Sequence, residues 1–160
     1  YTTLFRSPGS GPRSGVFSRD EKFFYLICEL SSQVMVFACE SGRMTWLQTV
    51  NTLPMDAGSR ANICSDLHLT PDGRYLFASN RGHDSICSFR VREDGTLETL
   101  CWSFCGGRTP RNFAVDPEGE TLLVGNQDSD NIAFFAIGKD GTLSLMNTVP
   151  FPSPVCIRFT

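Results

Sequence analysis

The sequence predicts an all-β protein, and within that class a β-propeller made of about three four-stranded antiparallel blades and a final strand. A motif that recurs at a fixed distance along the chain indicates a repeated unit. Short apolar runs bounded by turn residues indicate strands, and no segment sustains the 3.6-residue apolar period of an amphipathic helix. Units of four strands and roughly 40–50 residues are typical of propeller blades.

The repeat is clearest in its turns. Asp94-Gly95-Thr96-Leu97 recurs as Asp140-Gly141-Thr142-Leu143, 46 residues further along the chain. The other matches at this offset are Pro71-Asp72-Gly73 with Pro117-Glu118-Gly119, Asn80 with Asn126, Ile86 with Ile132, and Phe89 with Phe135. A degenerate copy lies upstream at an offset of 52, because residues 53–62 add a longer loop. A β-sandwich is the alternative, but it does not predict a repeat at fixed spacing.

Each repeat has the same order of elements, and together the repeats form one domain that spans residues 1–160. The blades cover about residues 13–52, 63–105 and 109–150. First strands are expected at 15–18, 65–69 and 112–115, and second strands at 23–28, 75–79 and 121–125. Third strands are expected at 34–38, 86–91 and 132–137, fourth strands at 45–50, 98–103 and 143–148, and a closing strand at 154–159. The second strands are apolar on both faces, which is typical of sheets buried on both sides.

Three blades and one strand do not close a ring, because propellers typically have about four to eight blades. We therefore expect either that further blades are missing from this chain or that identical chains associate to cover the open blade faces. The absence of an initiator Met favours the first explanation.

Composition narrows the possible partners and the compartment. The net charge is −3, and no basic block is present, so a nucleic-acid partner is not expected. The longest apolar run, residues 23–28, is far too short to span a membrane. Seven cysteines form an odd number without framework spacing, and most lie in apolar runs. This pattern favours a reducing, cytoplasmic location.

Polar residues recur at equivalent positions beside the expected channel. The loops after the second strands align, so that Glu29, Arg81 and Gln127 are equivalent, and the residues before the first strands align Arg13 with Arg111. If the first strands line the channel, all these loops share one mouth. We expect the charged side chains to converge there.

The residue types at this mouth indicate acid/base chemistry on an anion. Arginine presents a planar fork of donors that suits carboxylate or phosphate, and a carboxylate can relay a proton. The candidate catalytic residues are Glu29 and His83, with His83 as a proton carrier. The candidate substrate-binding residues are Arg13, Arg81, Arg111 and Gln127. The structural alternative is that Arg–Glu pairs join adjacent blades.

No metal or cofactor is expected. The pairs Cys64 with His68 and His83 with Cys87 have superficial zinc-ligand spacing. Residues four apart on a strand are about 13 Å apart, which is too far to share one ion. Asp128-Ser129-Asp130 lacks the Gly and the distal Glu of a calcium loop.

Several strings resemble a known family. They are Gly-Pro-Arg at 11–13, Glu-Leu-Ser-Ser at 29–32, Ser-Asn-Arg-Gly-His-Asp-Ser-Ile at 79–86, and Thr-Pro-Arg-Asn-Phe at 109–113. In this order they resemble the lactonase family of propellers, typified by the bacterial 6-phosphogluconolactonases, with the fungal carboxymuconate cyclases as relatives. The resemblance implies a seven-bladed propeller longer than this chain and lactone hydrolysis without a metal. In the cyclase branch it implies a site of arginines, a glutamate and a histidine from an earlier blade.

Arg13, Glu29 and Arg81 stand at the matching motifs. Two neighbours depart from the family pattern, because Ser14 stands where the family usually has His and Cys28 where it usually has Asn. The expected function is hydrolysis of a small anionic lactone, first of all 6-phosphogluconolactone in the pentose phosphate pathway. The alternatives are a non-catalytic propeller that binds a partner or small anion, and a muconate-lactonising isomerase.

Overall fold

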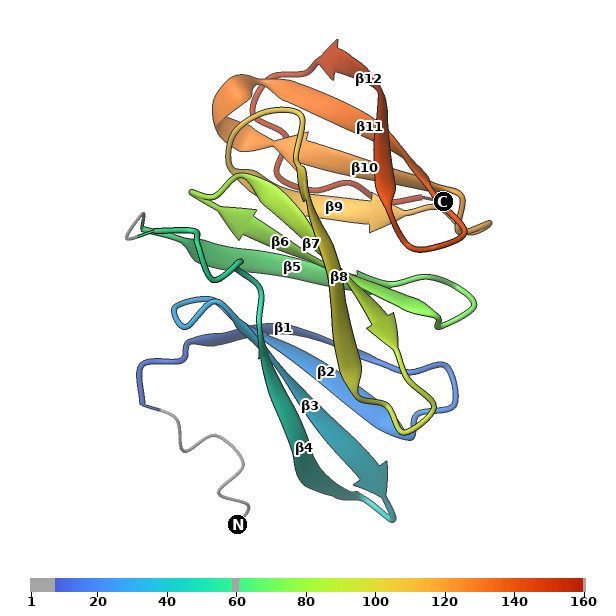
Figure 1. Ribbon diagram of the computed structural model, residues 1–160. Helices are drawn as coiled ribbons and strands as arrows, with labels where there is room; N and C mark the ends of the chain where they lie inside the picture. Colours follow the sequence, from blue (N-terminus) through green and yellow to red (C-terminus); the bar gives the residue numbers. More distant parts are fainter. Residues whose placement is uncertain (1–7, 59–60, 160) are drawn as a thin grey trace.

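The computed structural model describes residues 8–58 and 61–159. Within these ranges the chain forms three four-stranded antiparallel sheets, each an up-and-down meander in chain order (Figure 1). The first sheet contains β1 (Pro12–Phe17), β2 (Phe23–Cys28), β3 (Gln33–Glu40) and β4 (Arg43–Asn51). The second contains β5 (Ile63–Leu69), β6 (Tyr75–Arg81), β7 (Ser85–Val91) and β8 (Leu97–Phe104). The third contains β9 (Pro110–Val115), β10 (Thr121–Asn126), β11 (Asn131–Ile137) and β12 (Leu143–Pro150), with a short 3-10 turn, η1 (Gln127–Ser129), after β10.

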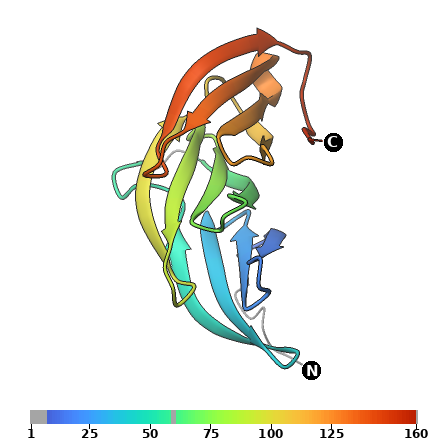
Figure 2. The same ribbon diagram turned by 90° about the vertical axis from the view of Figure 1, so that its right-hand side faces the viewer.

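The sheets stack side by side as the blades of a partial propeller, which confirms the predicted fold class. The first strands of the three sheets are neighbours, because β5 contacts both β1 and β9. Figure 2 shows these strands on the concave side of the arc, while β4, β8 and β12 follow its convex side. The first strand of each blade is therefore the innermost one and faces the propeller axis.

Two apolar cores lie between the blades, and β6 contributes to both. Leu76 and Ala78 belong to the core shared with the first blade, whereas Tyr75 and Phe77 belong to the core shared with the third. Alternate residues of a strand point to opposite faces, so the continuous apolar run of β6 fills both cores. Each fully buried large side chain contributes about 1.5–3 kcal/mol relative to exposure. This explains why the second strands are apolar on both faces.

Contacts with the preceding blade explain why the Asp-Gly-Thr turn recurs. Gly95 and Gly141 have positive φ values of 79° and 85°. A Cβ added to Gly95 would lie 2.2 Å from the Phe23 ring, and one added to Gly141 would lie 2.5 Å from the Tyr75 ring. Each turn thus requires glycine both for its backbone conformation and because an aromatic ring of the preceding blade lies directly against it.

Hydrogen bonds complete these turns. The carboxylate of Asp94 accepts the backbone N–H of Thr96 at 3.0 Å and its hydroxyl at 2.6 Å, and Asp140 accepts the same pair from Thr142 at 3.1 and 2.7 Å. The Tyr25 hydroxyl donates to the Gly95 carbonyl across the blade junction at 3.0 Å. The repeated motif is therefore part of the packing between blades.

The expected closing strand at 154–159 does not form, and this prediction was wrong. Those residues carry no strand. Instead the segment crosses the third sheet: the Ile157 N–H donates to Asn112 Oδ1 at 2.6 Å, and a Cβ added to Gly125 would lie 3.2 Å from Pro154. Pro152 and Pro154 lack the N–H groups that a strand donates.

Among the described residues, no helix has the length and apolar character needed to cross a membrane.

Candidate functional site

The innermost strand of every blade carries a β-bulge near its first residues. In β1 and β9 the extra residue is an arginine, Arg13 and Arg111, while in β5 the residues Ser65 and Asp66 lie opposite one residue of β6. Bulges turn a side chain away from its regular direction and are common beside functional sites. The bulge therefore removes Arg13 and Arg111 from the regular alternation of their strands.

The loops that the sequence aligned do meet at one end of the blades. The Glu29 N–H donates to the Gly11 carbonyl at 2.7 Å, and the Gln127 N–H donates to the Thr109 carbonyl at 3.0 Å. The Glu29 carbonyl in turn accepts the Cys64 N–H of the next blade at 3.0 Å. We call this end of the channel the mouth.

Three of the predicted residues form one cluster at the mouth, the Arg13–Glu29–Arg81 cluster. The Arg81 guanidinium donates to Oε1 of Glu29 and to the Cys64 carbonyl, the latter at 3.1 Å. Arg13 Nε lies 3.8 Å from Oε2 of Glu29, and another nitrogen of Arg13 donates to the Ser65 carbonyl. One carboxylate therefore lies between two guanidinium groups that come from two different blades.

The cluster is partly withdrawn from water. The Arg81 side chain is 12% exposed, and those of Arg13 and Glu29 are each 31% exposed. Within the described residues, Nε of Arg81 is buried and has no hydrogen-bond partner. A buried donor without a partner is uncommon in proteins. Because protein atoms already cover Nε, an anionic ligand would be attracted by the charge of the guanidinium and not by a hydrogen bond from Nε. The cluster carries a net positive charge, which favours such a ligand.

A cavity of about 340 Å³ adjoins Arg81 at the mouth. Asn62, Ile63, Thr109 and Asp128 also line it, so it lies between the loops of the second and third blades. The Thr109 hydroxyl donates to Oδ2 of Asp128 at 2.6 Å on the wall contributed by the third blade. The guanidinium of Arg81 thus has space beside it for a small ligand.

The other predicted residues lie apart from the cluster. Arg111 donates to Oε1 of Gln127 at 3.0 Å on the third blade. Nδ1 of His83 lies 2.7 Å from the Ser85 hydroxyl, and its backbone N–H donates to Oδ1 of Asn62 at 3.2 Å. In the described part of the chain, neither Arg111 nor His83 has a hydrogen bond or ion pair with the cluster.

Burial disfavours the thiolate form of the two cysteines nearest the cluster, Cys28 and Cys64, and raises the pKa of both. The neutral thiol is therefore the stable form near pH 7, and a neutral thiol is a poor nucleophile.

Sequence reasoning missed a second polar cluster on the innermost strands. Asp66 is 8% exposed, and its Oδ2 lies 3.1 Å from Nε2 of His68 and accepts the Asn112 amide at 2.6 Å. The available signal was the Asp-x-His spacing, which places both side chains on one face of an expected strand. His68 was considered only as a zinc ligand with Cys64.

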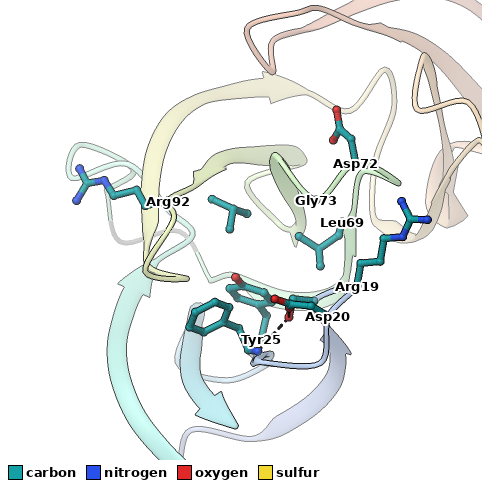
Figure 3. Close-up of a pocket in the computed structure, with 10 residues that line it drawn as sticks. Arg19, Asp20, Tyr25, Leu69, Asp72, Gly73 and Arg92 are labelled. Atoms are coloured by element: carbon teal, nitrogen blue, oxygen red, sulfur yellow. Dashed lines mark hydrogen bonds between the residues drawn. The ribbon is translucent and has the colours of Figure 1, made fainter. Parts of the chain in front are cut away.

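A further cavity of about 500 Å³ lies away from these residues, between the first two blades (Figure 3). Tyr25, Leu69 and Asp72 line it, beside the β1–β2 and β5–β6 turns. A similar cavity of about 460 Å³ occurs at the next junction, lined by Tyr75 and Lys139 among others. Because it recurs at both junctions and contains none of the candidate site residues, we attribute it to blade packing.

Within residues 8–58 and 61–159, no group of three or more His, Cys, Asp or Glu side chains is placed to hold a metal ion.

Known proteins resemble this chain over almost its whole length. A family model described as "Lactonase, 7-bladed beta-propeller" matches residues 2–159. A 6-phosphogluconolactonase of Bacillus subtilis is 35% identical over 158 residues, which cover 96% of this chain and 45% of that protein. The periplasmic gluconolactonase of Pseudomonas aeruginosa is 40% identical with a TM-score of 0.89, over 94% of this chain and 43% of that chain.

A protein from Lactobacillus plantarum is 36% identical with a TM-score of 0.91, over 95% of this chain and 46% of that chain. The chain thus spans less than half the length of these relatives. The match to the family model, together with the structural agreement of all three blades, is sufficient to assign the family. The chain belongs to the lactonase family of seven-bladed β-propellers.

Proposed function

We propose that the protein hydrolyses the lactones of sugar acids, with 6-phosphogluconolactone as the preferred substrate. The observation that carries this proposal is the Arg13–Glu29–Arg81 cluster, which joins two guanidinium groups and a carboxylate beside a cavity at the mouth. The relatives named 6-phosphogluconolactonase and gluconolactonase support the same reaction class.

In this proposal the arginines bind the substrate and Glu29 orders the site. The guanidinium of Arg81 binds the phosphate group. Arg13 donates to the lactone carbonyl oxygen, where negative charge develops during attack by water. Glu29 holds both guanidinium groups in position and accepts a hydrogen bond from the attacking water.

We assign Arg111, Gln127 and His83 to the rim of the site. Arg111 and Gln127 lie on the third blade, where they contact the part of the substrate that extends from the cavity. His83 follows Arg81 by two residues on the β6–β7 loop, where it serves as a hydrogen-bonding group and proton carrier for the substrate.

A non-catalytic anion-binding propeller is the second candidate. The observation that favours it is that both oxygens of Glu29 already face guanidinium groups of two blades, as in an ion pair that joins blades. Such a cluster would bind a phosphorylated sugar acid without hydrolysing its lactone.

We also propose that further blades cover the outer sheets. Phe17 and Phe24 lie with ring centroids 4.7 Å apart on the first blade, and Phe17 is 46% exposed. Leu123 and Phe134 form a cross-strand pair on the third blade and are half-buried. These side chains alternate with residues that fill the two cores, so they belong to faces that a neighbouring blade would bury. Two measurements on the 160-residue chain test this: analytical ultracentrifugation, and binding of a fluorescent dye that reports exposed apolar surface. A stable monomer that does not bind the dye would contradict the proposal.

We propose a reducing, cytoplasmic location, because all seven cysteines are free thiols. The relative from Pseudomonas aeruginosa is named periplasmic, so the location needs its own test. Cell fractionation should recover the protein with cytoplasmic markers, and recovery with periplasmic markers would contradict the proposal.

Acid release from freshly generated 6-phosphogluconolactone tests the function. The assay should use the full-length protein and should subtract the spontaneous rate. Gluconolactone, which lacks the phosphate, is the matched substrate. We expect hydrolysis above the spontaneous rate and a preference for the phosphorylated lactone. Binding of 6-phosphogluconate by folded protein that accelerates neither reaction would instead establish the anion-binding candidate.

A further inference from the structure

A carboxylate–imidazole pair lies on the innermost strand of the second blade, outside the Arg13–Glu29–Arg81 cluster. Oδ2 of Asp66 and Nε2 of His68 are 3.1 Å apart. The two residues are separated by one position on β5, so their side chains lie on the same face of the strand. The Asp66 side chain is 11% exposed, whereas the His68 side chain is 39% exposed. The carboxylate is thus buried behind an accessible imidazole.

Both blades at this junction fix the carboxylate. Oδ2 of Asp66 accepts the Asn112 amide at 2.6 Å, and Oδ1 accepts the Leu67 N–H at 3.1 Å. Asn112 belongs to the third blade and is itself fixed, because its Oδ1 accepts the Ile157 N–H at 2.6 Å. These donors hold the carboxylate in one orientation, in which Oδ2 can accept a hydrogen bond from His68.

The carboxylate determines which nitrogen of His68 carries the proton. An ionised carboxylate only accepts hydrogen bonds, so Nε2 of neutral His68 is the protonated nitrogen and Nδ1 keeps its lone pair. The Phe113 ring packs edge-on against the imidazole, with centroids 4.9 Å apart, which restrains the ring plane. Throughout the described ranges, no hydrogen-bond partner of Nδ1 is found. A partly exposed imidazole therefore has an unoccupied basic nitrogen.

This pair lies close to the Arg13–Glu29–Arg81 cluster along the same strand. Arg13 donates to the carbonyl of Ser65, the residue directly before Asp66 in the β5 bulge. His68 follows Asp66 by two residues, which is about 7 Å along an extended strand. An elongated substrate with its phosphate at Arg81 and its lactone carbonyl at Arg13 can therefore extend along β5 towards His68.

We propose that His68 is the general base of lactone hydrolysis and that Asp66 is the residue that positions it. This inference rests on the proposed function. Water attacks the lactone carbonyl carbon, a C–O bond forms, and the water proton moves to Nδ1 of His68. Asp66 remains ionised and stabilises the imidazolium. The tetrahedral intermediate then breaks the ring C–O bond, and the departing ring oxygen takes the proton back from Nδ1. The product is the open hydroxy acid.

Substitutions in the full-length protein test the pair. We expect His68→Gln to lower kcat for 6-phosphogluconolactone by about 100-fold or more, with little change in KM. Asp66→Asn removes the negative charge that stabilises the imidazolium, so we expect a loss of similar size. Free imidazole should restore part of the activity of His68→Ala, because it supplies the missing base. Asp140→Asn, a matched change in an exposed turn, should leave kcat unchanged.

The outcomes separate this inference from the proposed function. If the wild type hydrolyses neither lactone, the proposed function fails and the general base fails with it. If the wild type is active and folded His68→Gln keeps its kcat, His68 is not the base although the function stands. If kcat falls only because the variants unfold, and imidazole does not restore activity in His68→Ala, the proposal is wrong. Asp66 and His68 would then only stabilise the contact between blades.

A spectroscopic measurement covers the case in which the variants do not fold. Nitrogen-15 chemical shifts of His68 in the wild type should show a protonated Nε2 and an unprotonated Nδ1 in the neutral ring. The opposite tautomer would place the proton on the nitrogen assigned as the base, and it would overturn the proposal without any variant.

Discussion

The guanidinium of Arg81, at the end of β6 in the second blade, donates a hydrogen bond to the carboxylate of Glu29, in the first blade. Arg81 is the less exposed partner, and its Nε is buried without a partner in the described structure. The contact joins two blades, and it also leaves a positive group beside a cavity. The predictions below separate the structural role of this contact from a catalytic one.

Arg81→Met should mainly raise KM for 6-phosphogluconolactone, by about ten- to a hundredfold. The substitution retains a long apolar side chain but removes the charge that binds the phosphate, and a hydrogen bond to a charged group contributes about 1.5–3 kcal/mol. Steady-state kinetics on 6-phosphogluconolactone and gluconolactone check this. The KM for gluconolactone should change less, because that substrate has no phosphate. An equal increase for both substrates would remove Arg81 from phosphate recognition.

Gly95→Ala should destabilise the protein by about 2–4 kcal/mol, because it combines a left-handed backbone with a collision against the Phe23 ring. Gly42→Ala is the matched control, since Gly42 has a φ of 74° but nothing lies within 4 Å of its added Cβ. It should cost about 1 kcal/mol, the backbone contribution alone. The two midpoints of urea unfolding measure the difference. Equal midpoints would show that the contact between the turn and the preceding blade contributes nothing.

Stability should fall as the pH rises from about 9 to about 12, and Cys105 should account for part of this fall. Burial raises the pKa of Cys105 from its ordinary value of 9.0 to about 12, and its thiol donates to the Gly107 carbonyl at 3.1 Å. The unfolded state loses this proton first, so the stabilisation is complete below pH 9 and is lost as the pH rises towards 12. One thiol contributes at most about 1.4 kcal/mol per pH unit. Cys105→Ala should flatten the alkaline slope of unfolding free energy against pH, and an unchanged slope would contradict the assignment.

The repeat predicted the blades, and it predicted that Arg13, Glu29, Arg81 and Arg111 converge at the mouth. The first three do so, whereas Arg111 pairs with Gln127 instead. Strand runs and turn motifs recur at a fixed offset, and residue-by-residue alignment of the loops brought Arg13, Glu29 and Arg81 to the same end of the channel. The β-bulges could not be predicted, since one extra residue in a strand depends on its pairing with the next strand.

The same limitation hid the pair of Asp66 and His68. Their shared face is visible from the spacing, but the neighbouring Asn112 comes from another blade, and only the packed structure brings it within 2.6 Å. The prediction of a closing strand was wrong for a related reason. Residues 154–159 contact the third sheet through the side chain of Asn112 and beside Gly125 instead.

The most direct test is the turnover of Glu29→Gln on 6-phosphogluconolactone in the full-length protein, with thermal unfolding measured on the same sample. The substitution keeps the shape of the side chain and removes the charge between the two arginines. We expect kcat to fall by about 100-fold, because small displacements of positioned groups have effects of that size. Glu98→Gln, in an exposed ion pair with Arg90, is the control and should keep its turnover. Wild-type turnover in Glu29→Gln, or a loss explained entirely by unfolding, would contradict a catalytic role for the cluster at the mouth.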